Sequence, residues 1–347
     1  MKSMIRTPAE VLRDLEKPVI DPCNEIVVSP DDWLVVCGGF EERSVGALER
    51  ALTRGVPFNV LLIRYEPAVA ANKSESIHSL CEAKGINIVE LKYNRQDPAG
   101  FGTVITKKLR TSCARLFIDI SGMSRLLIVQ ILVGLAKHPE HFKRCYVVYS
   151  EALTYPPTQE EAAVKLSMVE SDPSFSVFFL SSGVYEVTLL PELSSGAPAG
   201  AQTRLVAFPS LDAHQLTALR AELQPSRLSL IEGIPPRKDY QWRKNMIADV
   251  NRLSDLSNTE RYSVSTLYYE ETLSNLLKIY EDHGLYERIL ISPTGSKMQT
   301  VAVGLLRAFL EDIQIVYPTP TDFLKPEKYT HGIGQMHLLS LEPFAKH

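Results

Sequence analysis

Short apolar runs alternate along this chain with amphipathic stretches of helical periodicity. Residues 33–37 form an apolar run that ends in a glycine pair, and residues 40–52 place Val45, Leu48 and Leu52 on one helical face. The unit recurs, with strands expected at 58–64, 86–91, 116–120 and 144–149 and helices at 74–84, 102–111 and 123–137. Strands that alternate with helices predict parallel strands joined by right-handed crossovers.

The pattern starts again after residues 191–202, a stretch rich in Ser, Gly, Ala and Pro. Four matched positions recur in order at a spacing of about 170 residues: Leu34 with Leu205, Val60 with Leu228, Ser121 with Thr294, and Tyr149 with Tyr317. We therefore predict an α/β fold of tandem duplicated Rossmann-like domains. Each should have a mostly parallel sheet, helices on both faces, and a terminal hairpin or strand.

The expected boundaries follow from these repeats. Residues 1–30 read as a lead-in with one short helix at 9–15, residues 31–190 as the first domain, 191–202 as a linker, and 203–347 as the second domain. A hairpin at 176–190 should close the first domain, and a strand at 335–341 should close the second.

Composition narrows the class of protein. A formal net charge of −4 gives no general attraction to nucleic acid or to an anionic membrane, so we expect neither as a partner. The five cysteines form no CxxC pair, and His138 and His141 have no third ligand beside them, so we expect no disulfide framework and no metal site. The apolar segment near Leu126 is too short to span a bilayer, and residues 1–10 lack the apolar core of a signal peptide, which favours a cytoplasmic protein.

The predicted topology places the ligand site. In a doubly wound sheet the first and fourth strands lie side by side, and ligands bind beyond their carboxyl ends. This brings the 38–44 turn beside the 121–125 turn, and the 209–214 turn beside the 292–297 turn. The turns after the fifth strands, 150–155 and 318–322, should overhang the same rims.

Residue types in these turns suit a phosphate-bearing ligand. Glycines allow close approach of backbone N–H groups, hydroxyls donate hydrogen bonds, basic side chains add charge, and tyrosines stack on bases. The predicted ligand-binding residues are Gly38, Gly39, Phe40, Arg43, Ser44, Ser121, Gly122, Ser124, Arg125, Tyr149, Thr294, Gly295, Ser296, Lys297 and Tyr317. The alternative is that both turns merely cap helices. Neither a P-loop nor a GxGxxG pattern is present, so no nucleoside triphosphatase site and no nicotinamide cofactor is expected.

Three acids in the first half are candidates for acid–base chemistry: Glu41, Glu42 and Asp119. The interpretation we favour is structural. Asp119 would hold the Ser121 turn by hydrogen bonds, and the glutamates would cap the next helix. The second half has Ser292 where Asp119 would lie.

A family resemblance follows from these residues. The spacing Asp119-x-Ser121-x-x-x-Arg125 resembles the motif after the fourth strand of CARF domains, the CRISPR-associated Rossmann-like sensors of cyclic oligoadenylate. Two such domains in one chain are similar to the SAVED arrangement, which reads cyclic di- to tetranucleotides in antiphage signalling. The second half departs from the motif, with Ser292 at the acidic position, Met298 at the basic position, and Lys297 one residue early.

The resemblance implies a nucleotide sensor that signals to a separate effector protein, since no stretch here looks like a nuclease, protease or DNA-binding module. Two alternatives stay open. One is an enzyme that hydrolyses a nucleotide or phosphosugar, of the ring-nuclease or phosphodiesterase kind, with the first-half acids. The other is a structural subunit with vestigial pockets. The apolar helix at 126–135 is expected to bury a second face on the other half or on a second copy of the chain, as a homodimer.

Overall fold

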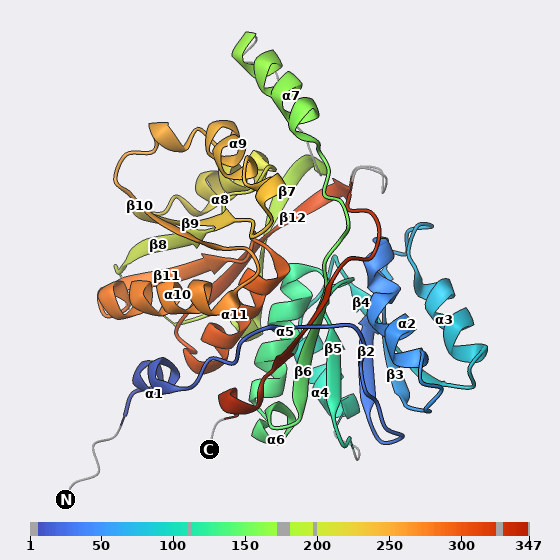
Figure 1. The fold of residues 1–347 in the computed structure, drawn as a ribbon. Coiled ribbons are helices and arrows are strands. Elements are labelled where there is room, and N and C mark those ends of the chain that lie inside the picture. The colour runs from blue at the N-terminus through green and yellow to red at the C-terminus, as the bar shows by residue number, and fades with distance from the viewer. Residues whose placement is uncertain (1–5, 110–112, 172–180, 197–199, 324–328, 346–347) are drawn as a thin grey trace, which may run out of the picture. The chain divides into compact units, whose positions relative to one another are not determined.

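The computed structural model describes residues 6–109, 113–171, 181–196, 200–323 and 329–345, and the chain forms two compact units (Figure 1). One comprises Leu15–Tyr155 and Tyr329–His347 and contains a sheet of seven described strands; we call it the seven-stranded unit. The other comprises Met1–Asp14 and Pro156–Lys328 and contains a sheet of six described strands; we call it the six-stranded unit. Each is described separately below.

The sheet of the seven-stranded unit has the order β1-β13-β6-β5-β2-β3-β4. Its strands are β1 (Asp21–Cys23), β2 (Trp33–Cys37), β3 (Asn59–Glu66), β4 (Asn87–Asn94), β5 (Leu116–Asp119), β6 (Cys145–Ser150) and β13 (Met336–Ser340). The helices between them are α2 (Gly46–Leu52), α3 (Ser74–Glu82), α4 (Phe101–Leu109), α5 (Arg125–Ala136) and α6 (Pro139–Phe142). Strands β2 to β6 pair in parallel, and β13 pairs with β6 in antiparallel fashion.

The apolar runs form this sheet because both of its faces are covered. Leu34 and Val36 of β2 are fully buried on one face, against Leu48 of α2 and Ile77 of α3. Helix α5 is buried at every position from Leu126 to Leu135. It lies against α4, where a Cβ on Gly134 would come within 2.6 Å of the Gly102 carbonyl oxygen. Helix α4 of the same unit therefore covers one face of the apolar helix α5.

The sheet of the six-stranded unit has the order β10-β9-β8-β11-β12-β7. Its strands are β7 (Ser181–Leu189), β8 (Gln202–Ala207), β9 (Arg227–Ile234), β10 (Thr259–Ser265), β11 (Glu287–Ser292) and β12 (Gln314–Phe323). The helices are α1 (Pro8–Asp14), α7 (Gln159–Ser171), α8 (Ala213–Leu223), α9 (Arg243–Val250), α10 (Tyr269–His283) and α11 (Lys297–Phe309). Its core includes Leu205, Leu219 and Leu230, which are all buried.

The predicted fold class is confirmed. In both units five parallel strands follow one order, in which the first strand lies between the second and the fourth: β4-β3-β2-β5-β6 and β10-β9-β8-β11-β12. Beyond the fifth parallel strand each sheet continues with antiparallel pairing, through β7 in one sheet and through β13 and then β1 in the other. The protein is therefore a tandem of Rossmann-like α/β domains.

The predicted domain boundaries are wrong at the antiparallel strands β7 and β13. Strand β7, expected in a hairpin of the first domain, pairs with β12 in the six-stranded sheet. Strand β13, expected to close the second domain, pairs with β6 in the seven-stranded sheet. The partner residues 176–180 of the expected hairpin lie outside the described residues. The outer strand of any sheet leaves backbone groups unpaired, so local sequence does not determine which segment covers it.

The lead-in is also more structured than expected. The predicted helix forms as α1, which contacts α10 and α11, and its Leu12 is fully buried. Residues 21–23 form β1, which extends the seven-stranded sheet beside β13. The predicted turn at 318–322 is wrong, because β12 continues through it to Phe323 and pairs with β7, with a shift of register between Pro320 and Asp322.

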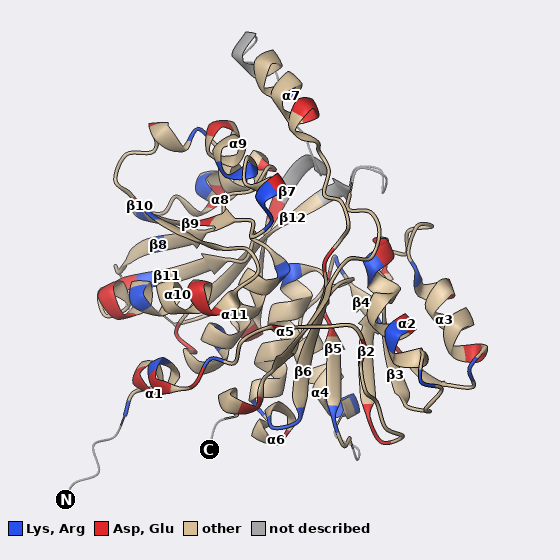
Figure 2. Ribbon diagram, viewed as in Figure 1, with Lys and Arg blue, Asp and Glu red and all other residues tan. Residues whose placement is uncertain are grey.

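Acidic and basic residues are interspersed along helices such as α2 and α10 (Figure 2), in keeping with the small net charge. Within the described residues, no helix combines the length and the apolar character that crossing a bilayer requires.

Arg204 of β8 is expected to be essential to the stability of the six-stranded unit. Its side chain is 4% exposed, its Nε lies 2.5 Å from Glu287 Oε2, and its Nη1 lies 2.8 Å from Ser229 Oγ. Arg204→Met leaves the Glu287 carboxylate buried without its cation, so the free energy of unfolding should fall by about 3–5 kcal/mol. Urea denaturation measures this change. Arg237→Met is the control, because its exposed pair with Asp239 contributes about 1 kcal/mol or less.

If Arg204→Met and Arg237→Met lower the free energy of unfolding by the same small amount, the Arg204 ion pair does not stabilise the six-stranded unit as proposed. Glu287→Gln in the Arg204→Met background should restore part of the lost stability, since it removes the uncompensated charge.

Candidate functional site

The two predicted turns of the seven-stranded unit lie in direct contact. They follow β2 and β5, which pair in parallel at the centre of the sheet. A Cβ added to Gly39 would lie 2.7 Å from the Gly122 carbonyl oxygen, and one added to Gly122 would lie 2.8 Å from Ser44 Cβ and closer still to the Cys37 carbonyl. Glycine is needed at both positions because backbone approaches backbone there. The predicted juxtaposition of these turns is confirmed.

Hydrogen bonds within the unit shape the turn after β5. The Asp119 carboxylate accepts from the Ser121 N–H at 2.9 Å, which confirms the structural role preferred for this acid. Ser121 Oγ accepts from the Ser150 N–H at 2.8 Å and so connects the turn to the end of β6. Ser124 caps α5 by accepting from the Leu127 N–H. Much of the polarity of this turn therefore serves the fold itself.

Tyr65, at the end of β3, is a member of this site that sequence analysis missed. Its hydroxyl accepts from the Ser124 N–H at 2.5 Å and donates to the Gly122 carbonyl at 3.3 Å. Burial raises the pKa of this phenol well above its usual value, so it stays protonated. No local pattern marks a tyrosine in β3 as a partner of a turn roughly 60 residues later.

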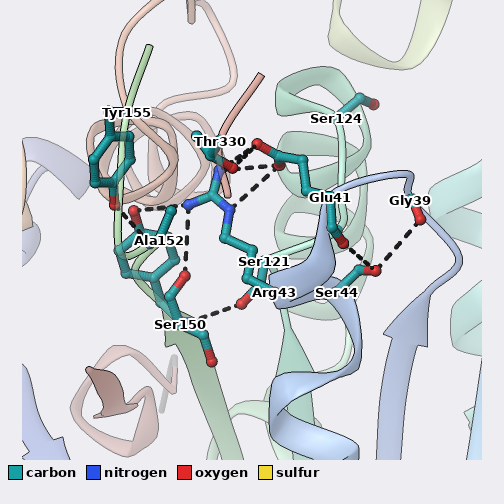
Figure 3. Close-up of polar contacts among 12 residues, drawn as sticks. Gly39, Glu41, Arg43, Ser44, Ser121, Ser124, Ser150, Ala152, Tyr155 and Thr330 are labelled. Carbon is teal, nitrogen blue, oxygen red and sulfur yellow. Dashed lines mark hydrogen bonds and ion pairs between the residues drawn. The ribbon is translucent and has the colours of Figure 1, made fainter. Parts of the chain in front are cut away.

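Arg43 places a buried positive charge at the carboxyl edge of the sheet (Figure 3). The residue is 5% exposed and lies in the 3-10 turn Glu42–Val45 between β2 and α2. Its Nη1 donates to Tyr149 Oη at 3.2 Å, and its Nε and Nη2 donate to the Glu41 carboxylate at 3.0–3.3 Å. The guanidinium thus reaches from its own turn to the end of β6.

The charge of Arg43 is permanent. Burial by itself would lower the pKa of its guanidinium, but the Glu41 carboxylate and the Tyr149 hydroxyl outweigh that effect and raise the pKa above its usual value. Burial raises the pKa of the nearby Tyr155 phenol as well, so this group stays neutral. The buried guanidinium of Arg43 is therefore a fixed charge at this edge, paired with the Glu41 carboxylate and beside neutral phenols.

The remaining predicted residues make contacts within the same unit. Ser44 is fully buried and donates to the Glu41 carbonyl at 2.7 Å, and Gly38 packs against Ser74 of α3. Tyr149 stacks on His337, with ring centroids 6.3 Å apart, so this face of its ring is occupied. Phe40 contacts Tyr329 edge to face.

Glu41 and Glu42 do not cap α2, so that part of the structural interpretation is wrong. Glu41 precedes the 3-10 turn without a side-chain cap bond, and its carboxylate accepts from Arg43 and, at 2.5 Å, from Thr330 Oγ1. Glu42 Oε2 accepts from the Gly332 N–H at 2.6 Å. Thr330 and Gly332 belong to the segment that leads into β13, and the sequence analysis assigned that segment to the other domain.

The equivalent turn of the six-stranded unit is held in a different way. Thr294 Oγ1 donates to the Phe208 carbonyl at 2.8 Å and accepts from the Phe208 N–H at 3.2 Å, joining the turns after β8 and β11. Ser296 and Gln299 form a capping box at the start of α11, and Ser296 also donates to the Thr266 carbonyl. A Cβ on Gly295 would lie 2.8 Å from the Phe208 ring.

The structure explains why Lys297 seemed to come one residue early. The turn after β11 is one residue shorter than the turn after β5, so Arg125 and Lys297 are both the first residue of their helices. Tyr317 lies half-buried on β12, opposite Thr188 of β7. Whether any of these predicted residues binds a ligand stays a prediction.

A hollow of about 740 Å³ lies beside the seven-stranded unit's turn, between α2 and α3, and Glu42, Lys73 and Ile333 are among its lining residues. Three glutamates and one lysine give it a mixed charge. Among the described residues, no group of three or more His, Cys, Asp or Glu side chains is placed to hold a metal ion.

Comparisons with known proteins define no family. No family model matches the chain, and neither does any curated protein. Among solved structures, a functionally unknown protein from Pseudomonas aeruginosa PAO1 is similar at 10% identity and a TM-score of 0.24, with 83% of this chain and 92% of that chain covered. The cytoplasmic domain of a prokaryotic cation chloride cotransporter matches at 10% identity and a TM-score of 0.24, with 84% and 96% covered. Similarity this low supports no conclusion about activity, and the class of protein rests on the fold itself.

Proposed function

We propose that the seven-stranded unit is a receptor for a phosphate-bearing nucleotide, which binds beside Arg43 and signals to a separate effector protein. The observation that carries this proposal is the buried, permanently charged guanidinium at the carboxyl ends of β2 and β6. Its Nε and Nη2 form a fork that already holds a carboxylate, the geometry that also suits phosphate oxygens. Ligands of doubly wound sheets bind at this edge.

The contacts of the acids favour a receptor over a hydrolase. Asp119 is 1% exposed and holds the Ser121 N–H, while Glu41 and Glu42 hold Arg43 and Gly332. A general base must reach the proton that it removes, and a carboxylate committed to the backbone of its own turn is poorly placed for that task.

The resemblance to CARF and SAVED proteins makes cyclic oligonucleotides the first ligands to test, and prokaryotic antiviral defence the setting we propose. Isothermal titration calorimetry should be run with cyclic di-, tri- and tetranucleotides and their linear counterparts. We expect saturable binding of at least one cyclic member, which chromatography then recovers intact. Binding weaker than about 1 mM for the whole panel, a free energy of about −4 kcal/mol, would refute the proposal. Recovery of a cleaved product would support the hydrolase instead.

A further inference from the structure

The segment Tyr329–Gln335, which we call the strap, runs along the edge that carries Arg43. At one end it contacts the turn after β2: Tyr329 lies on Phe40, with ring centroids 4.6 Å apart, and Thr330 Oγ1 donates to Glu41 Oε1 at 2.5 Å. At the other end Gly334 donates its N–H to the Glu151 carbonyl at 2.8 Å, and Gln335 leads into β13. The first two residues are thus held by side chains, whereas His331 pairs with Thr154 through backbone hydrogen bonds at 3.1 Å and the second end is held by backbone pairing.

Glu41 is the link between the strap and the buried cation. One of its oxygens, Oε1, accepts from both Arg43 Nη2 at 3.1 Å and Thr330 Oγ1, and the other, Oε2, accepts from Arg43 Nε at 3.3 Å and Nη2 at 3.0 Å (Figure 3). Any change that removes this carboxylate from Arg43 also removes the acceptor of Thr330.

The charges of this site allow two arrangements: Arg43 paired with Glu41, or Arg43 paired with a ligand phosphate. Arg43 and Glu41 have side chains that are 6% and 13% exposed, so the cation must keep an anionic partner while it is buried. A phosphate on the Nε and Nη2 fork would satisfy Arg43 and leave Glu41 as an uncompensated anion beside it. Repulsion and hydration then favour Glu41 turning to water.

The strap is built so that one end can move while the other stays. Gly332 lies between the two ends with φ +72°, a backbone region that favours glycine, and its N–H is bonded to Glu42. Arg50 Nη2 donates to the Gly334 carbonyl at 2.8 Å and fixes the far side. Ile333, between these glycines, lines the hollow described above.

We propose that Glu41 is a built-in substitute for the ligand phosphate: a phosphate that takes over the Arg43 fork displaces Glu41 and so releases the Tyr329–Thr330 end of the strap. This inference rests on the proposed function, and it names how occupancy of the site would be signalled to an effector. The released end carries the aromatic side chain of Tyr329, which leaves Phe40 together with Thr330.

Hydrogen exchange detected by mass spectrometry tests the inference on the full chain, with peptides that cover residues 329–335. The N–H groups of His331 and Gly332 donate to the Thr154 carbonyl and the Glu42 carboxylate, next to the Thr330–Glu41 bond. With saturating cyclic tri-AMP, or inorganic pyrophosphate as the simpler probe, these amides should exchange about tenfold faster, because loss of the neighbouring Thr330–Glu41 bond removes about 1.4 kcal/mol of local stability. Without any nucleotide, Thr330→Val and Glu41→Gln should each produce a similar increase. Peptides of β2 and β5, at the centre of the seven-stranded sheet, report that the fold of this unit is retained.

The outcomes separate the two proposals. Nucleotide binding by calorimetry with unchanged strap exchange overturns the inference and leaves the proposed function standing. If no probe binds, the proposed function fails, and the claim of ligand-driven release fails with it. Unchanged exchange in both variants shows, independently of any ligand, that Glu41 and Thr330 do not hold the strap.

Discussion

Replacing Arg43 with methionine is expected to weaken nucleotide binding strongly at the carboxyl edge of the seven-stranded sheet. Methionine fills similar space but removes the buried cation and its fork of donors. A buried, hydrogen-bonded charge pair costs about 2–5 kcal/mol when one partner is truncated, so affinity for the tightest-binding cyclic nucleotide should fall about 30-fold or more. Isothermal titration calorimetry measures the loss.

Two further variants make this result specific. Arg54→Met removes an arginine from the same unit whose side chain is 47% exposed and pairs with Glu25 at the surface, so it should bind nucleotide as the wild type does. Glu41→Gln should strengthen binding, since a neutral amide competes less well for the guanidinium. Equal affinities of the wild type and Arg43→Met would show that the ligand binds elsewhere.

Gly122→Val is expected to destabilise the seven-stranded unit as a whole. Its Cβ would lie 2.8 Å from Ser44 Cβ and closer still to the Cys37 carbonyl oxygen, and the backbone of β2 lies at the centre of the sheet and cannot retreat. Overpacking of this kind costs about 3 kcal/mol, which lowers the melting temperature of a domain of this size by about 6–12 °C. Differential scanning calorimetry resolves this change.

Gly196→Ala is the control for that experiment. A Cβ at Gly196 meets nothing within 4 Å, so this substitution should leave the melting temperature nearly unchanged. If Gly122→Val also melts as the wild type does, the two turns do not touch as described, and the central contact of the site is refuted.

What the sequence predicted well is governed by local rules. The polar turns after β2 and β5 follow buried apolar strands, and the Asp119 bond to the Ser121 N–H spans only two residues. Strand order followed because right-handed crossovers leave few topologies for alternating strands and helices. The repeat at a spacing of about 170 residues then predicted the strands and helices of the second unit from those of the first.

What the sequence did not predict depends on long-range pairing. Strand β13 lies beside β6, about 190 residues earlier in the chain, and nothing near residues 336–340 encodes that pairing. The partners of Glu41 and Glu42 were missed for the same reason, because Thr330 and Gly332 reach them only through that pairing. A signal was present in part: Glu41 and Arg43 lie two residues apart in a turn, which favours a local ion pair.

The misplaced basic residue of the second unit shows a different limit. A fixed spacing motif compares residues by count, whereas the helix start is set by the cap residue. Because Ser296 caps α11 one residue sooner than Ser124 caps α5, Lys297 occupies the position of Arg125 despite the shift.

A crystal structure of the full chain with cyclic tri-AMP would show whether the nucleotide takes the place of Glu41 on Arg43. We expect a phosphate group within hydrogen-bonding distance of Arg43 Nε and Nη2, with the Glu41 carboxylate turned to solvent. Density for the nucleotide at any other place, or none at saturating concentration, with Glu41 still bound to Arg43, would contradict this proposal.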